Sequence, residues 1–202
     1  MPTINFSLKD LNKLVGRKIT VDKLRELVAY GKGELQSCDG DEVSVNFDDT
    51  NLPYLWSVEG IARMIQGILG VKKGIPKLKI NKANFKIVVD SSVTKVRPYI
   101  GAFVAKNHKV NDYLIKQMVQ LQEKLCESYG RRREKVAIGV YNFDRIKFPI
   151  YYKATYPESI RFVPLDFKKS MTQAEILEEH PKGKEYGWII KEFTKYPILD
   201  DS

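Results

Sequence analysis

The sequence contains few of the residues that build metal centres or disulfide scaffolds. Its 202 residues include two cysteines, Cys38 and Cys126, and two histidines, His108 and His180. These positions are far apart and form no Cys-x-x-Cys pair, whereas a structural zinc site needs about four closely arranged ligands. We therefore expect no metal site and no disulfide framework. Two reduced thiols are typical of a cytoplasmic protein.

Long apolar runs and nucleotide-binding loops are also missing. The first six residues, Met-Pro-Thr-Ile-Asn-Phe, contain no basic region followed by an apolar run, so they do not predict a signal peptide. No stretch approaches the roughly 20 apolar residues that cross a bilayer, so we expect no membrane association. There is no phosphate-binding Gly-x-x-x-x-Gly-Lys-Ser/Thr loop and no Gly-x-Gly-x-x-Gly motif. No Ser/His/Asp or Cys/His arrangement stands out, and the sequence predicts no catalytic residue and no cofactor bound by this chain.

What the sequence does contain is positive charge. Lysine and arginine total 34 against 25 acidic residues, which gives a formal net charge of +9. A surplus of this size indicates either a polyanionic partner such as RNA or a well solvated surface, and charge alone favours neither. The chain is 43% hydrophobic, which is enough for a folded core.

Residues 1–70 show the patterns of a small α/β unit. Apolar and polar side chains alternate in its strands, and its helices follow hydroxyl residues that are favoured as N-caps. The expected elements are a strand at 2–6, helices after Ser7 and Thr20, a strand at 42–48, a turn at 49–53 and a helix from about Ser57.

Residues 71–84 predict a basic linker. Gly74 and Pro76 interrupt regular structure there. The segment also contains five lysines: Lys72, Lys73, Lys77, Lys79 and Lys82.

Residues 85–202 predict a second domain of mixed α+β type, so the whole chain falls in the α+β class. The expected elements are strands at 85–90, 99–105, 136–141, 150–154 and from Tyr196, a helix at 112–128, a capping-box helix after Thr172 and a short amphipathic piece at 186–193. The chain ends soon after entering its last strand. We therefore expect this second domain to be incomplete.

Two features of the 112–133 region are candidates for function. Arg131, Arg132 and Arg133 follow the predicted helix, where cations also suit the helix dipole. Interaction with the helix dipole accounts for one or two of these arginines. Three arginines in a row favour a further role for at least one of them, in holding a carboxylate, phosphate or ribose. Gln122 lies one position off the apolar stripe, which fits a pocket lining and a solvated helix face equally well.

Five segments resemble, in order and spacing, the motifs of one family. They are residues 49–63 (Asp-Thr-Asn-Leu-Pro-Tyr-Leu-Trp-Ser-Val-Glu-Gly-Ile-Ala-Arg), 96–99 (Val-Arg-Pro-Tyr), 120–125 (Gln-Leu-Gln-Glu-Lys-Leu), 131–144 (Arg-Arg-Arg, then Val-Ala-Ile-Gly and Phe-Asp) and 196–202 (Tyr-Pro-Ile-Leu-Asp-Asp-Ser). The family is the beta subunit of phenylalanine–tRNA ligase, of the archaeal and eukaryotic type. The chain resembles its amino-terminal part, including the start of the tRNA-editing domain.

The resemblance implies part of an enzyme that attaches phenylalanine to tRNA(Phe) with ATP and Mg²⁺. It also implies an alpha-subunit partner in an (αβ)₂ tetramer, and an editing domain that hydrolyses mischarged Tyr-tRNA(Phe). Gln122, Arg133 and Leu199 match positions that line the family's editing pocket. On this reading the 202-residue chain alone is inactive, because the aminoacylation site belongs to the alpha subunit and the rest of the editing pocket follows Ser202 in the family.

Two alternatives stay open. One is a free-standing deacylase of mischarged tRNA, and the other is a non-catalytic tRNA-binding or assembly module. Leu52 and Tyr54 stand where the family has an arginine and an aspartate, and this departure allows the second alternative.

Overall fold

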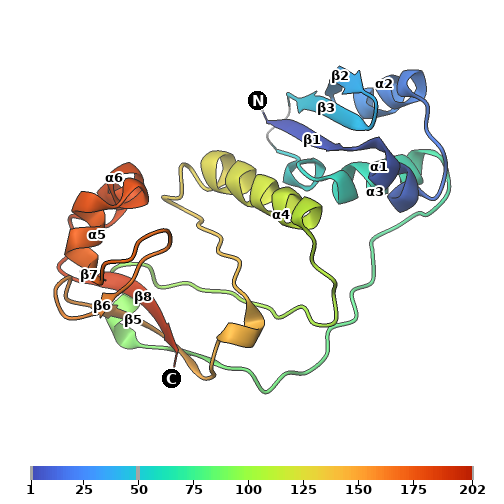
Figure 1. The fold of residues 1–202 in the computed structure, drawn as a ribbon. Coiled ribbons are helices and arrows are strands. Elements are labelled where there is room, and N and C mark those ends of the chain that lie inside the picture. The colour runs from blue at the N-terminus through green and yellow to red at the C-terminus, as the bar shows by residue number, and fades with distance from the viewer. Residues whose placement is uncertain (1, 49–50, 202) are drawn as a thin grey trace. The chain divides into compact units, whose positions relative to one another are not determined.

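The computed structural model describes residues 2–48 and 51–201. The chain forms two compact units, which are described separately: the first comprises Met1–Lys79 and His108–Gly139, and the second Ile80–Asn107 and Val140–Ser202. The α+β class is confirmed (Figure 1). The units differ from the predicted domains, because residues 108–139 group with the amino-terminal residues.

The first unit is built on a three-stranded antiparallel sheet. The strands are β1 (Thr3–Ser7), β2 (Gly33–Asp39) and β3 (Glu42–Phe47), in the order β1-β3-β2. Val43, Val45 and Phe47 of β3 are buried and alternate with more exposed residues, as predicted for a half-buried strand. Strand β2 was not predicted. Its sequence Gly-Glu-Leu-Gln-Ser-Cys-Asp is mostly polar, and pairing with β3 holds it in place.

Two helices of this unit begin at the predicted caps Ser7 and Thr20, and the third begins near Ser57 as predicted. They are α1 (Leu8–Val15), α2 (Val21–Ala29) and α3 (Val58–Ile68), with a 3₁₀ helix at Pro53–Leu55. The side chains of Ser7, Thr20 and Ser57 each accept a hydrogen bond from a backbone N–H in the first turn. Helices and sheet enclose one core, whose largest fully buried side chains include Ile4, Leu11, Leu24, Phe47, Trp56, Ile61 and Ile65. Of the predicted turn at 49–53, Asp49 and Thr50 lie outside the described residues.

The long helix α4 (Asp112–Lys124) packs on this same unit. It continues into a π-helical turn at Leu125–Tyr129, so the helix predicted at 112–128 is confirmed apart from its last turn. Leu121 of α4 and Leu125 of the π-helical turn are partly buried against the core of the first unit. Burial of these two leucines explains why α4 belongs with residues more than a hundred positions away in the sequence.

Two glutamines of α4 bind the edge strand β1. The Asn5 N–H donates to Oε1 of Gln120 at 2.8 Å, and the Asn5 carbonyl accepts from Nε2 of both Gln117 and Gln120 at 3.0 Å. These bonds satisfy a peptide group on the outer side of β1 that the sheet itself leaves unpaired. The helix therefore covers part of a sheet edge.

The predicted linker at 71–84 contains no helix or strand. Every residue in it is exposed except Pro76, which is half-buried. Residues up to Lys79 group with the first unit and those from Ile80 with the second. The segment's role as a linker stays a prediction.

The second unit has a smaller core and a mixed sheet. Strands β4 (Ile87–Val89), β5 (Ile150–Thr155) and β8 (Tyr196–Asp201) lie in the order β4-β5-β8, with β4 parallel and β8 antiparallel to β5. The strands predicted near these positions are thus confirmed. Val93, Tyr152 and Ala154 form the buried cluster. The other elements are the short pair β6 (Arg161–Phe162) and β7 (Met171–Thr172), the helices α5 (Gln173–Glu179) and α6 (Pro181–Tyr186), and 3₁₀ helices at Ser91–Val93, Phe143–Arg145 and Gly187–Ile189.

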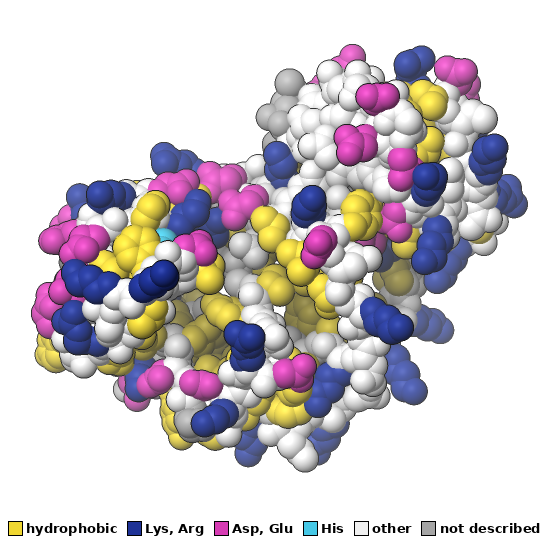
Figure 2. All heavy atoms as spheres, in the orientation of Figure 1, with side chains coloured by type: hydrophobic (Ala, Val, Ile, Leu, Met, Phe, Trp, Pro, Cys, Tyr) yellow, Lys and Arg dark blue, Asp and Glu magenta, His cyan; other side chains and the backbone are white. Residues whose placement is uncertain are grey.

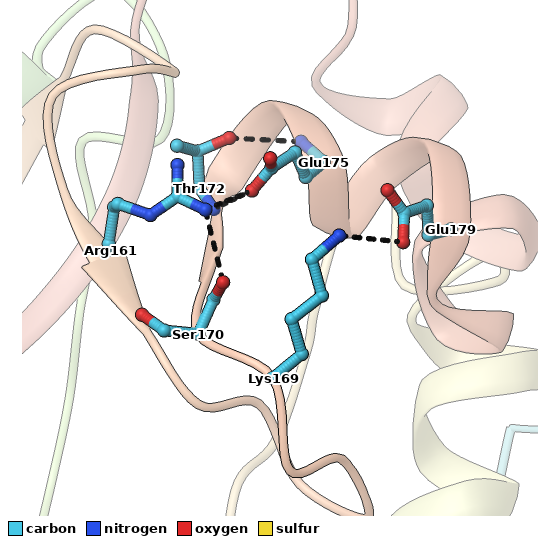
Figure 3. A network of polar contacts seen from close by, with 6 residues as sticks. All are labelled: Arg161, Lys169, Ser170, Thr172, Glu175 and Glu179. Atoms are coloured by element: carbon cyan, nitrogen blue, oxygen red, sulfur yellow. Dashed lines mark hydrogen bonds and ion pairs between the residues drawn. The ribbon is translucent and has the colours of Figure 1, made fainter.

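The predicted capping box at the start of α5 is confirmed (Figure 3). The Glu175 N–H donates to Oγ1 of Thr172 at 3.1 Å, and the Thr172 N–H donates to Oε2 of Glu175 at 2.7 Å. Arg161 of β6 donates to the same carboxylate at 2.9 Å and to the Ser170 carbonyl at 3.1 Å. This network therefore connects the β6–β7 pair to helix α5. The contacts among these side chains account for their arrangement without a ligand.

Two predicted strands, at 99–105 and 136–141, are wrong. Both segments lack β structure, and Tyr99 and Phe103 are 93% and 92% exposed. Apolar and β-branched residues favour a strand only when a neighbouring strand supplies hydrogen bonds, and neither segment has such a neighbour among the described residues.

Candidate functional site around Arg133

The arginine turn at the end of α4 has an unusual backbone. Arg131, Arg132 and Arg133 have φ values of 50°, 53° and 68°, so three successive residues with side chains adopt the left-handed conformation. Each such residue costs about 1–2 kcal/mol relative to the right-handed form. The sequence did not predict this geometry, because Gly and Asn are the usual residues at positive φ.

Hydrogen bonds to the preceding helical turn compensate for this strain. The last carbonyls of a helix lack partners within the helix itself. Here three of them accept backbone hydrogen bonds: Cys126 from Arg133 at 2.9 Å, Glu127 from Arg132 at 3.0 Å and Ser128 from Arg131 at 3.1 Å. The arginine turn is therefore a fixed C-terminal cap, and the position of each arginine is set by the helix.

Gly130 allows the chain to close on itself here. A Cβ at this position would lie 2.4 Å from the Val136 carbonyl oxygen and 2.5 Å from that of Cys126. The returning chain is also held by Cys126, whose Sγ accepts from the Ile138 N–H at 3.3 Å. Residues 126–138 thus form a closed loop that only glycine at 130 permits.

Arg133 differs from its two neighbours in burial and in its partner. Its side chain is 16% exposed, and Nη2 donates to Oε1 of Glu123 at 2.6 Å. Arg131 and Arg132 are exposed. A charge-assisted bond of this length orients the planar guanidinium against α4. The Arg133 guanidinium is therefore held in a defined orientation beside Glu123.

Glu123 is the residue that the sequence analysis missed. It belongs to the 120–125 motif, but its distance of ten positions from Arg133 predicts no contact. The left-handed turn reverses the chain and returns Arg133 to the last turns of the helix.

The other two predicted pocket residues lie in different places. Gln122 is half-buried on α4, one residue before Glu123, in the first unit. Leu199 lies on β8 of the second unit, where it faces Tyr152 in the ladder and is 41% exposed. The pocket formed by these residues therefore stays a prediction.

Basic side chains do not gather into one patch on the visible face. In Figure 2 the lysines and arginines are scattered and interleaved with acidic side chains. Within residues 2–48 and 51–201, no three of the His, Cys, Asp and Glu side chains lie close enough together to hold a metal ion. In the same part of the chain no helix is long and apolar enough to cross a membrane.

Comparison with known proteins identifies the relatives of this chain. The beta subunit of phenylalanine–tRNA ligase from Pyrococcus horikoshii is 43% identical over 206 aligned residues, which cover 100% of this chain and 37% of the relative. The corresponding subunits of Thermococcus sibiricus and Methanosphaera stadtmanae are 42% and 38% identical, again over the whole chain. This chain is homologous to archaeal phenylalanine–tRNA ligase beta subunits. The resemblance stated from the five motifs is confirmed.

A solved structure supports the same relationship. The crystal structure of an N-terminal fragment of the phenylalanyl-tRNA synthetase beta subunit from Pyrococcus horikoshii matches with a TM-score of 0.89 and 42% identity. The match covers 100% of this chain and 59% of that chain. This chain spans about 37% of the length of the curated phenylalanine–tRNA ligase beta subunits that it matches. No protein-family model matches it.

Proposed function

We propose that this chain serves as the amino-terminal region of a phenylalanine–tRNA ligase beta subunit. In this role it contributes, with an alpha subunit in an (αβ)₂ tetramer, to the attachment of phenylalanine to tRNA(Phe) in the cytoplasm, with ATP and Mg²⁺ supplied to the complete enzyme. The observation that carries the proposal is identity of about 43% along the whole chain to such subunits.

We further propose that Gln122, Arg133 and Leu199 contribute to a pocket that removes tyrosine from mischarged tRNA(Phe). Editing has a clear physical purpose, because a hydrophobic pocket rejects an added hydroxyl only by a factor on the order of 10². A second pocket that hydrogen-bonds the tyrosine hydroxyl selects in the opposite sense. None of the three side chains is an obvious general base, so hydrolysis would use a positioned water.

The geometry of the arginine turn supports a role for Arg133 in particular. Glu123 fixes its guanidinium, and a group held in one orientation positions a substrate better than a mobile one. The same observation fits a purely structural ion pair. The reaction rates of the variants described below separate these two roles.

The test uses a chimeric enzyme. This chain replaces the matching amino-terminal part of the Pyrococcus horikoshii beta subunit, which is co-expressed with the alpha subunit of that organism. The chimera is expected to form Phe-tRNA(Phe) and to hydrolyse Tyr-tRNA(Phe) faster than Phe-tRNA(Phe). This chain alone is expected to show no phenylalanine-dependent ATP–pyrophosphate exchange and little hydrolysis of Tyr-tRNA(Phe).

Two matched variants test the editing site. Arg133→Ala is expected to lower Tyr-tRNA(Phe) hydrolysis by roughly ten- to a hundred-fold, the effect of losing one charged hydrogen bond in the transition state. Aminoacylation should not change. Arg131→Ala, two residues away and exposed, should leave both rates little changed. If both variants lose the same fraction of the Tyr-tRNA(Phe) hydrolysis rate, and if this loss becomes smaller at higher salt, the pocket is contradicted. Such a result would indicate that the arginines make diffuse contacts to phosphates.

A tRNA-binding or assembly module is the second candidate function. The exposed lysines at 71–84 favour it, because an exposed basic segment attracts phosphates without forming a pocket. A chimera that charges tRNA(Phe) normally but edits no Tyr-tRNA(Phe), with the unmodified Pyrococcus enzyme as control, would support this function over editing.

A further inference from the structure

The second unit contains a pocket that the proposed editing residues do not use. It has a volume of about 320 Å³ and is lined by Ser91, Ser92, Lys95, Val96, Phe193, Thr194 and Lys195. The lining thus combines two cationic side chains and three hydroxyls with one aromatic ring. It contains no carboxylate.

Both walls of the pocket are anchored to strand β5. On one side Ser92 Oγ accepts from the Ala154 N–H at 2.9 Å, and the Asp90 N–H donates to the Tyr152 carbonyl at 2.9 Å. Tyr152 in turn donates its hydroxyl to the Arg97 carbonyl at 2.7 Å, which holds the far end of the 91–97 segment.

On the other side, Tyr196 begins β8 and pairs with Thr155 of β5. This pairing fixes the position of the 193–195 segment. Because one strand holds both walls, the pocket is preformed and a ligand would not have to order it.

The charges near the pocket favour an anion. Asp90 lies beside the lining, but its carboxylate already accepts from the Ser92 N–H at 2.8 Å. Hydrogen bonding from Ser92, with smaller contributions from the charges of Lys195 and Lys153, lowers the pKa of Asp90. Lys153 is itself paired with Asp200 at 2.6 Å. The lysines therefore exceed the carboxylates around the pocket by one charge.

The side chains match the parts of a nucleotide. Lysine ammonium groups and hydroxyls are common ligands of phosphate oxygens. Phe193 is 37% exposed at the pocket wall, and an aromatic side chain in that position is suited to stacking on a base. Lys195 lies 4.8 Å from the centre of the Tyr156 ring, which places a second aromatic side chain next to this cation.

We propose that this pocket binds one nucleotide, with its phosphate at Lys95 and Lys195 and its base against Phe193. The nucleotide can belong to a single-stranded RNA or be a free mononucleotide, because the recognised chemistry is the same. The inference goes beyond the editing function and does not require Gln122, Arg133 or Leu199 to act on tRNA.

The test is an NMR titration of the ¹⁵N-labelled 202-residue chain with three probes: inorganic phosphate, uridine 5′-monophosphate and single-stranded hexauridylate. With either uridine probe, amide shifts are expected to cluster at residues 91–96 and 193–195. Tighter binding of hexauridylate would assign the site to RNA, and equal binding of both would assign it to a free nucleotide. Shifts with inorganic phosphate alone, or shifts spread evenly over all exposed lysines, would overturn the proposal.

Variants separate the two halves of the site. Lys95→Gln and Lys195→Gln are each expected to weaken binding of both uridine probes by up to about fivefold, as for a solvent-accessible ion pair. Phe193→Leu should weaken them by about fivefold or more and leave phosphate binding unchanged. Lys168→Gln, an equal loss of charge at an exposed lysine outside the lining, is the control. Equal weakening in Lys168→Gln, or no change in Phe193→Leu, would contradict the site, provided that unchanged amide shifts elsewhere show the variants to be folded.

Discussion

Nη2 of Arg133 lies 2.6 Å from Oε1 of Glu123, across the left-handed turn that ends helix α4. The first unit contains a second ion pair of the same length, between Lys23 and Glu26 on α2. The two pairs differ in exposure, since the Arg133 side chain is 16% exposed and that of Lys23 is 49% exposed. Their comparison therefore tests what burial adds to an ion pair.

Glu123→Gln is expected to destabilise the chain by about 1 kcal/mol, a value that allows for the partly exposed Glu123 carboxylate. Glu26→Gln should have no measurable effect, because solvent screens the Lys23 pair. Urea unfolding of both variants at pH 7 provides the measurement. Equal midpoints for the two would show that the Arg133 pair does not stabilise the turn.

The glycine at position 130 gives a steric prediction. Gly130→Ala would place a methyl group against two carbonyl oxygens at 2.4 and 2.5 Å, and is expected to cost about 1–3 kcal/mol. Gly67→Ala in helix α3 is the control, since nothing lies within 4 Å of its Cβ. There alanine should stabilise the chain by about 0.5–1 kcal/mol through its higher helix propensity. Thermal unfolding that shifts both variants in the same direction would contradict the closed loop.

Tyr113 predicts a pH dependence. Its hydroxyl accepts from the Ser7 N–H at 3.2 Å and donates to Asp10 at 3.1 Å. Burial, followed by the nearby Asp10 charge, raises its pKa from 10.0 to about 12. A raised pKa means that the folded state holds the proton more tightly, so this contribution is complete below pH 10 and is lost as the pH rises towards about 12.

Tyr113→Phe is expected to cost about 1 kcal/mol at pH 8, through the lost hydrogen bonds. It should also lessen the fall in stability between pH 10 and 12. The check is the difference in urea midpoint between the unmodified chain and the variant across this range. A constant difference would show that Tyr113 titrates alike in the folded and unfolded states.

The exposed basic segment 71–84 predicts the site of first proteolysis. Trypsin is expected to cleave after one of its lysines before it cleaves at the arginine turn, because the latter is held by three backbone hydrogen bonds. Mass spectrometry of early fragments identifies the cut. Resistance throughout 71–84, with cleavage elsewhere, would count against its role as a linker.

The local features of this protein were readable from its sequence. Ser7, Thr20 and Thr172 cap the helices that they were predicted to cap. Each of these interactions joins residues three apart, and the short-range pattern contains all the information needed. The alternation in β3 likewise identified its buried face, and the order of five motifs identified the relatives.

Long-range pairing decided the rest. Strand β2 is mostly polar and is held by its pairing with β3, whereas the apolar segment 99–105 has no such neighbour among the described residues and forms no strand. The contact between Asn5 and Gln120 joins residues 115 positions apart and assigns α4 to the first unit. The orientation of Arg133 depends on three left-handed residues of a type that rarely adopts that conformation. In each case the deciding energy comes from a partner distant in sequence or from closure of the chain, which only the tertiary structure supplies.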